Sequence, residues 1–144
     1  MSQAAPYVWT AADLEADRSW QIDLPSSVLS EVNALFPSLQ GRALEGLTID
    51  DCPLPSFEAL AAQIREELRA GRGLVQLRSL PVDEWSREDI ALAYWIIGTH
   101  IGVGVSQSYK GDRLGEVRDI GEGGRYYTVG GSLEMHMDPV DVVG

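Results

Sequence analysis

The sequence predicts an α+β fold in which helices come first and a sheet begins afterwards. Two observations carry this prediction. Apolar residues recur at helical spacing in three stretches before residue 98. From Gly98 to Gly131 the chain has ten glycines interspersed with valine, isoleucine and tyrosine, a composition typical of strands and turns. The sheet that this second stretch begins looks incomplete within the 144 residues.

The first elements are an entry segment, a strand and a helix. Residues 6–24 are expected to form a short extended or helical entry followed by a strand, which Pro25 ends. Ser26 or Ser27 is a suitable N-cap for a helix that runs to about Phe36, where Pro37 is expected to stop it. The apolar stripe of this helix consists of Leu29, Val32 and Phe36. A turn-rich stretch follows, from residue 44 to residue 55.

A second helix is predicted after Ser56, its expected N-cap, and it ends at Gly71 and Gly73. Its apolar positions are Phe57, Leu60, Ala61, Ile64 and Leu68. A short strand over 74–77 follows and is closed by Pro81.

The third helix opens with a capping-box pattern at residues 86–89 and is expected to run through Ile97. Its apolar residues occupy most of the circumference, which predicts a helix buried between layers.

Charge and composition exclude several classes of function. The net charge is −11 and the pI is near 4.4, so there is no basic patch for nucleic acid and an anionic membrane surface would repel the chain. No apolar run approaches the length of a membrane span, and the N-terminus lacks the pattern of a signal peptide, so the expected location is cytoplasmic. The single cysteine, Cys52, excludes an internal disulfide and is interpreted as an inert loop thiol.

The residues most suited to chemistry lie in the sequence His136-Met137-Asp138. In an extended strand, residues i and i+2 point to the same face, so His136 and Asp138 would project together. An imidazole nitrogen and a carboxylate oxygen suit a first-row divalent metal, and one more histidine would complete a facial triad. The alternative is a solvated or hydrogen-bonded pair.

Several motifs occur in an order and spacing that resemble one known family. They are GRGLVQLRSLP (71–81), GTHIGVGVSQS (98–108), GDRL (111–114), VRDIG (117–121), RYY (125–127), HMD (136–138) and DVVG (141–144). This series resembles the taurine- and clavaminate-type (TauD/TfdA-like) branch of the Fe(II)/2-oxoglutarate-dependent dioxygenases. The resemblance covers roughly residues 56–144 and, more loosely, Trp9–Trp20.

The resemblance implies a double-stranded β-helix, or jelly roll, with helices packed outside it. It implies that His136 and Asp138 are the first two iron ligands, that 2-oxoglutarate is the cosubstrate, and that a small organic substrate is hydroxylated. In the family, the second histidine ligand and the arginine that binds 2-oxoglutarate lie far downstream, whereas only six residues follow Asp138 here. Residues 1–144 are therefore expected to be a single N-terminal portion of such a domain, with an incomplete sheet and little activity alone.

An alternative hypothesis is a truncated, non-catalytic domain that acts as a binding or assembly module and self-associates through exposed sheet edges. Other candidates remain open between two interpretations. Gln107 and Arg125 could contact the substrate, or they could be solvated or ion-paired on the surface. His100 is interpreted as a satisfied, partly buried histidine at a helix end.

Overall fold

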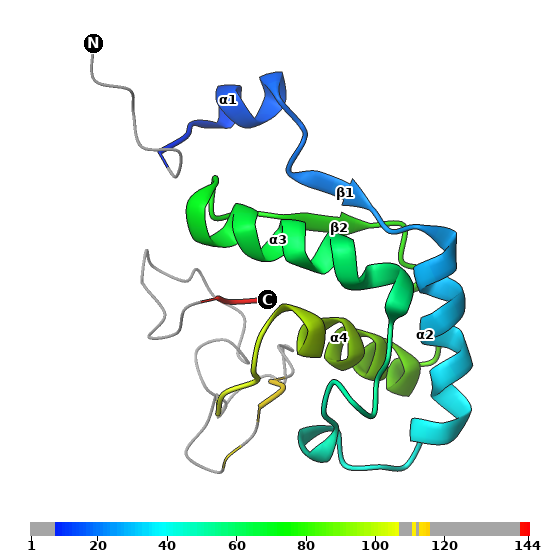
Figure 1. Ribbon diagram of the computed structural model, residues 1–144. Helices are drawn as coiled ribbons and strands as arrows, with labels where there is room; N and C mark the ends of the chain where they lie inside the picture. The colour runs from blue at the N-terminus through cyan, green and yellow to red at the C-terminus, as the bar shows by residue number, and fades with distance from the viewer. Residues whose placement is uncertain (1–7, 107–110, 112, 116–141) are drawn as a thin grey trace, which may run out of the picture. The chain divides into compact units, whose positions relative to one another are not determined.

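The computed structural model describes residues 8–106, 111, 113–115 and 142–144. The chain divides into two compact units, Met1–Val103 and Gly104–Gly144. Every helix and strand of the described residues lies in the first unit (Figure 1).

The elements follow one another as helix, strand, two helices, strand and helix. Two single-turn 3-10 helices, Leu44–Gly46 and Pro55–Phe57, lie between the second and third helices. The main elements are α1 (Ala11–Ala16), β1 (Gln21–Asp23), α2 (Ser26–Leu39), α3 (Glu58–Ala70), β2 (Gln76–Arg78) and α4 (Arg87–Ile101).

Strands β1 and β2 pair in parallel, with Ile22 opposite Leu77. Both of these side chains are half-buried and pack against the core, while Gln21 donates a side-chain hydrogen bond to Gln76 across the pair at 2.9 Å. A parallel pair requires a long crossover connection, and here α2 and α3 lie within it. The expected jelly roll concerns residues that the structure does not describe, so it stays a prediction.

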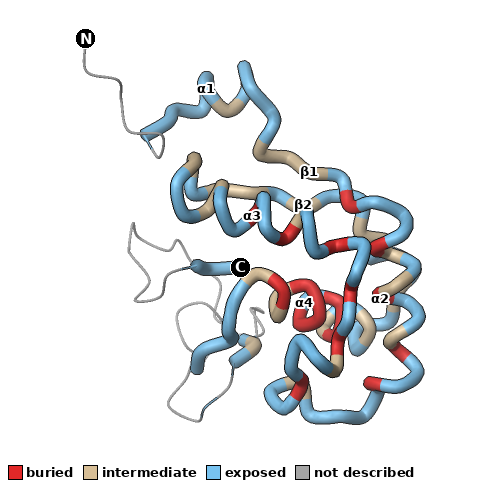
Figure 2. Tube along the Cα trace, viewed as in Figure 1, coloured by how far each residue is buried: buried red, intermediate tan, exposed pale blue. Residues whose placement is uncertain are grey.

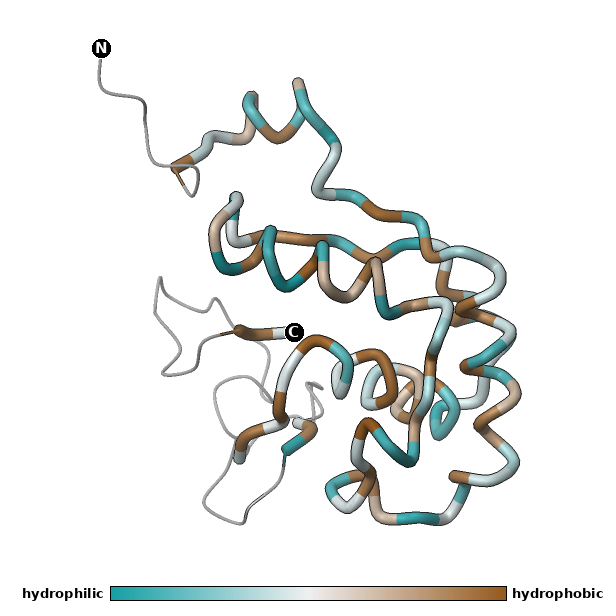
Figure 3. Tube along the Cα trace, in the orientation of Figure 1, coloured by the Kyte–Doolittle hydropathy of each residue, from teal (hydrophilic) through white to brown (hydrophobic). Residues whose placement is uncertain are grey.

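The core of the first unit lies among α2, α3 and α4 (Figures 1 and 2). Hydrophobic residues recur along all three helices (Figure 3), and those that face inward are buried. The largest fully buried side chains are Phe57, Leu39, Leu54, Ile64, Leu92 and Ile96. Within the described residues, no helix is both long enough and apolar enough to cross a membrane.

Helix α2 corrects two expectations. Neither Ser26 nor Ser27 caps it, because Pro25 occupies the N-cap position and Ser26 is already the first helical residue. Pro37 does not stop it either, since the helix continues to Leu39. Pro37 lies in the last turn, where the missing N–H removes one helical hydrogen bond, and the burial of Leu39 offsets that loss.

The other two helices were predicted more accurately. Helix α3 ends at Gly71 as expected, but Ser56 does not cap it: its hydroxyl donates to the Glu31 carboxylate of α2 at 2.6 Å. The capping box of Ser86 and Asp89 at the start of α4 is confirmed.

Helix α4 continues beyond the predicted end at Ile97. Gly98 lies inside the helix because the next turn is anchored by the buried His100. Among the described residues Ile90 and Tyr94 remain 37% and 47% exposed, so α4 is buried on most of its circumference but not on all of it.

Candidate functional site

The four residues proposed from the sequence as site residues, His136, Asp138, Gln107 and Arg125, all lie outside the described residues. In the part of the chain that is described, there is no group of three or more His, Cys, Asp or Glu residues placed to hold a metal. The metal and substrate assignments therefore remain predictions. What the structure adds is the arrangement of the residues that precede this segment.

His100 occupies the last turn of α4 and is buried, with 6% of its surface exposed. Its Nε2 lies 2.7 Å from the carbonyl oxygen of Cys52. Because a carbonyl only accepts, Nε2 donates this hydrogen bond. The ring of Phe57 packs edge-on against the imidazole, at 5.9 Å between ring centroids. The interpretation of His100 as a satisfied helix-end histidine is confirmed.

The end of α4 has a second contact, from α3. Arg65 donates a guanidinium hydrogen bond to the carbonyl oxygen of His100. This carbonyl is among the last four of the helix, which lack partners within it, and a cation there also opposes the negative end of the helix dipole. Arg65 and His100 thus fix the end of α4 just before the chain enters the segment with the predicted site residues.

Cys52 is fully buried in the loop between α2 and α3. Burial raises the pKa of its thiol, and the neighbouring Asp51 carboxylate raises it further. Both effects disfavour the thiolate, which is the reactive form. The interpretation of Cys52 as an inert thiol agrees with this environment, and its carbonyl oxygen serves as the acceptor for His100.

Asp51 holds the turn that presents this carbonyl. Its carboxylate accepts hydrogen bonds from the Thr48 backbone N–H at 3.0 Å, the Thr48 hydroxyl at 2.8 Å and the Arg42 guanidinium at 2.8 Å. The Thr48 N–H, followed by Arg42, lowers the pKa of Asp51 to about 2. These contacts are structural, because every partner belongs to the same loop.

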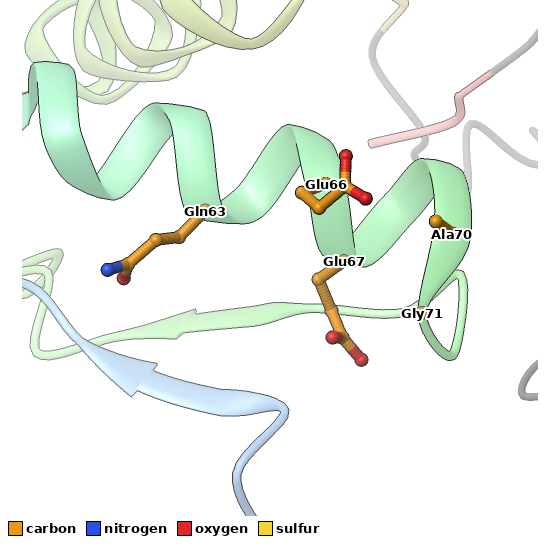
Figure 4. Close-up of a pocket in the computed structure, with 5 residues that line it drawn as sticks. All are labelled: Gln63, Glu66, Glu67, Ala70 and Gly71. Carbon is orange, nitrogen blue, oxygen red and sulfur yellow. The ribbon is translucent and has the colours of Figure 1, made fainter.

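A shallow surface depression lies along the second half of α3, lined by Gln63, Glu66, Glu67, Ala70 and Gly71 (Figure 4). Gln63 and Glu67 point to one side of the helix, and Glu66 points to the other. Both carboxylates have partners: Arg69 donates to Glu66 at 2.6 Å, and the Arg72 N–H donates to Glu67 at 3.0 Å. The depression is therefore a solvated helix surface with satisfied charges.

Sequence reasoning missed two contacts that build this region. Arg65 had no local signal, because its partner lies 35 residues away at the end of another helix. The indole of Trp95 donates to the carbonyl oxygen of Leu47 at 3.1 Å across 48 residues. Trp95 is one of the apolar residues that predicted a buried third helix, and it is buried, but no local pattern identifies Leu47 as its partner.

Comparison with known proteins shows a similarity to an enzyme. The chain is 30% identical, over 146 aligned positions, to FR-33289 synthase from Streptomyces rubellomurinus (strain ATCC 31215). The alignment covers 94% of this chain and 42% of the synthase, so the chain spans less than half the length of this relative. No family model matches the chain. Because the alignment leaves so little of the chain uncovered, it includes residues of both units.

Proposed function

We propose that this chain is part of an Fe(II)- and 2-oxoglutarate-dependent dioxygenase that oxidises a small organic substrate. The proposal rests on two observations together: the alignment with FR-33289 synthase over 94% of the chain, and the His136-Met137-Asp138 motif of the sequence. Similarity to an enzyme over this much of the chain favours a catalytic role for the His-x-Asp triplet over its occurrence by chance. The assignment of Fe(II) and 2-oxoglutarate is supported by the series of motifs between residues 71 and 144.

The donor set of the chain fits Fe(II). His136 offers a neutral imidazole nitrogen near neutral pH and Asp138 an ionised carboxylate, a combination that suits a first-row divalent metal with open positions. The bound iron and 2-oxoglutarate would supply the activation of dioxygen. Arg125 is suited to bind a substrate carboxylate, and Gln107 is suited to orient the substrate by hydrogen bonds.

On this proposal His100 is not the third protein ligand. The chain has two histidines, and the Nε2 of His100 is already bonded to the carbonyl oxygen of Cys52. Detaching that nitrogen would leave a buried acceptor unpaired, at a cost of about 1–3 kcal/mol. His136 and Asp138 alone should therefore bind a metal weakly.

Metal titration tests the proposal. Co(II) serves as the spectroscopic probe, and its visible absorption reports imidazole and carboxylate coordination. His136→Ala and Asp138→Ala should each weaken Co(II) binding by about tenfold or more, because each removes one of two ligands. Met137→Leu is the matched control, since the residue between the ligands would face the other way in a strand. Unchanged Co(II) binding in both alanine variants would contradict the metal assignment.

A further inference from the structure

The segment that precedes β1, residues 8–19, which we call the strap, lies on the surface of the first unit. All of its residues are exposed except Leu14, which is half-buried. Within the described part of the chain, α1 has no buried residue and the strap contributes none to the hydrophobic core (Figure 2). Burial of apolar surface therefore contributes little to holding the strap in place: Leu14 is half-buried and Trp9 keeps 41% of its surface exposed.

Polar contacts to one residue, Arg72, hold it instead. The Trp9 indole N–H donates to the Arg72 carbonyl oxygen at 3.0 Å. The Arg72 guanidinium donates to the Ser19 hydroxyl at 2.8 Å and forms an ion pair with the Asp17 carboxylate. Both ends of the strap are thus joined to the same position, which is more than 50 residues away in the sequence.

The turn between α3 and β2 is built to present this arginine. The Glu67 carboxylate folds back to accept the Arg72 N–H, and its backbone carbonyl accepts the N–H of Gly73. A Cβ at Gly71 would lie 2.8 Å from the Glu67 carbonyl oxygen and closer still to its carboxylate, so the position requires glycine. Gly73 has φ +73°, which also favours glycine. The Arg72 side chain, 23% exposed, is consequently fixed beside the strap.

We propose that the strap is a conformational device that detaches from the first unit as one body, with Arg72 as its attachment point, while α2, α3 and α4 stay folded. Trp20 is the hinge. Its carbonyl oxygen accepts a hydrogen bond from the N–H of Gln76, the first residue of β2, at 2.8 Å. Its indole N–H donates to the carbonyl oxygen of Leu14 at 3.1 Å. The partly exposed ion pair between Asp17 and Arg72, which lies close to the hinge, is weakened by salt, so ionic strength controls the opening.

Limited trypsin digestion of the whole chain measures this opening, because Arg18 is exposed within the strap. When opening is fast relative to cleavage, the rate of cleavage after Arg18 follows the population of the open form. Arg72→Met should raise this rate by roughly three- to tenfold at low salt. Arg69→Met is the matched control. It removes one trypsin site at the end of α3, but within the described part of the chain Arg69 pairs with Glu66 and not with the strap, so the rate should stay unchanged.

Two further measurements decide the proposal. Between about 0.01 M and 1 M salt the screening length falls from roughly 30 to 3 Å, so the wild-type rate should rise toward that of Arg72→Met. Ser19→Ala removes a contact from the strap side without touching α3, and should also raise the rate while the melting temperature stays constant. An unchanged rate in both Arg72→Met and Ser19→Ala would overturn the proposal, as would a rise that always accompanies a loss of core stability.

Discussion

Helices α1 and α4 begin in the same way but are held to the molecule differently. Each starts with a complete capping box, formed by Thr10 and Asp13 in α1 and by Ser86 and Asp89 in α4. Helix α4 continues for 15 residues and buries six of them, whereas α1 ends after 6 residues and, among the residues that the structure describes, buries none.

The difference shows that capping and burial have separate effects on a helix: capping determines where it starts, and burial determines whether it unfolds with the core. A capping box satisfies the free N–H groups of the first turn and so determines where a helix starts. A helix as short as α1 is marginal by itself, and tertiary packing decides whether a helix becomes part of the cooperative fold. On this view α4 unfolds with the core and α1 can unfold without it.

The largest loss of stability should come from truncating a buried side chain of α4. Ile96 is fully buried, so Ile96→Ala should lower the free energy of unfolding by about 2–5 kcal/mol through lost burial and a cavity. Urea denaturation followed by circular dichroism measures the loss. Ile90→Ala is the matched control on the same helix, because Ile90 is 37% exposed and should lose much less. Equal losses in the two variants would contradict the assignment of the core face.

A smaller loss of stability should follow when the cap of α4 is removed, and none when the cap of α1 is removed. Ser86→Ala should lower the free energy of unfolding by about 0.5–2 kcal/mol, because the Asp89 N–H loses its acceptor in a helix that belongs to the core. Thr10→Ala removes the equivalent acceptor from Asp13 and should leave global unfolding unchanged, while amide exchange in α1 becomes faster. A loss of global stability in Thr10→Ala as large as in Ser86→Ala would break the comparison.

The smallest expected effect is on how the free energy of unfolding depends on pH under acidic conditions. The Ser86 hydroxyl, followed by Gln40, lowers the pKa of Asp89, and the Thr10 hydroxyl lowers that of Asp13. A carboxylate whose pKa is depressed by folding stabilises the fold above its ordinary pKa of about 3.9, and this contribution is lost as the pH falls below that value. Asp89→Asn should therefore flatten the decline of global stability below about pH 4. Asp13→Asn should not, and denaturation curves at several pH values distinguish the two.

The sequence predicted features that depend on neighbouring residues and missed those that depend on distant ones. The start of α4 was predicted because Ser86 and Asp89 are three positions apart. Ser56 was misassigned because its partner, Glu31, lies 25 residues away and competes with the cap. The burial of His100 was expected from its place at a helix end, but no local pattern identifies the Cys52 carbonyl as its acceptor.

The same distinction between neighbouring and distant residues applies to the candidate site. The residue types and spacing of His136 and Asp138 indicate which metal chemistry they suit, and this needs only the sequence. The positions of His136 and Asp138 relative to other side chains lie outside the residues that the structure describes. The proposed metal site therefore rests on the sequence alone, whereas the helical unit rests on contacts among the described residues.

The parallel pairing of β1 and β2 also sets an order of events during synthesis. Gln21 meets Gln76 across 55 residues, so the first strand leaves the ribosome long before its partner exists. At about 5–20 residues per second, β1 waits roughly three to ten seconds. During this interval its polar residues, Gln21 and Asp23, keep the unpaired strand hydrated and make it a poor template for a neighbouring nascent chain. The order of translation is thus matched by a first strand that tolerates the delay.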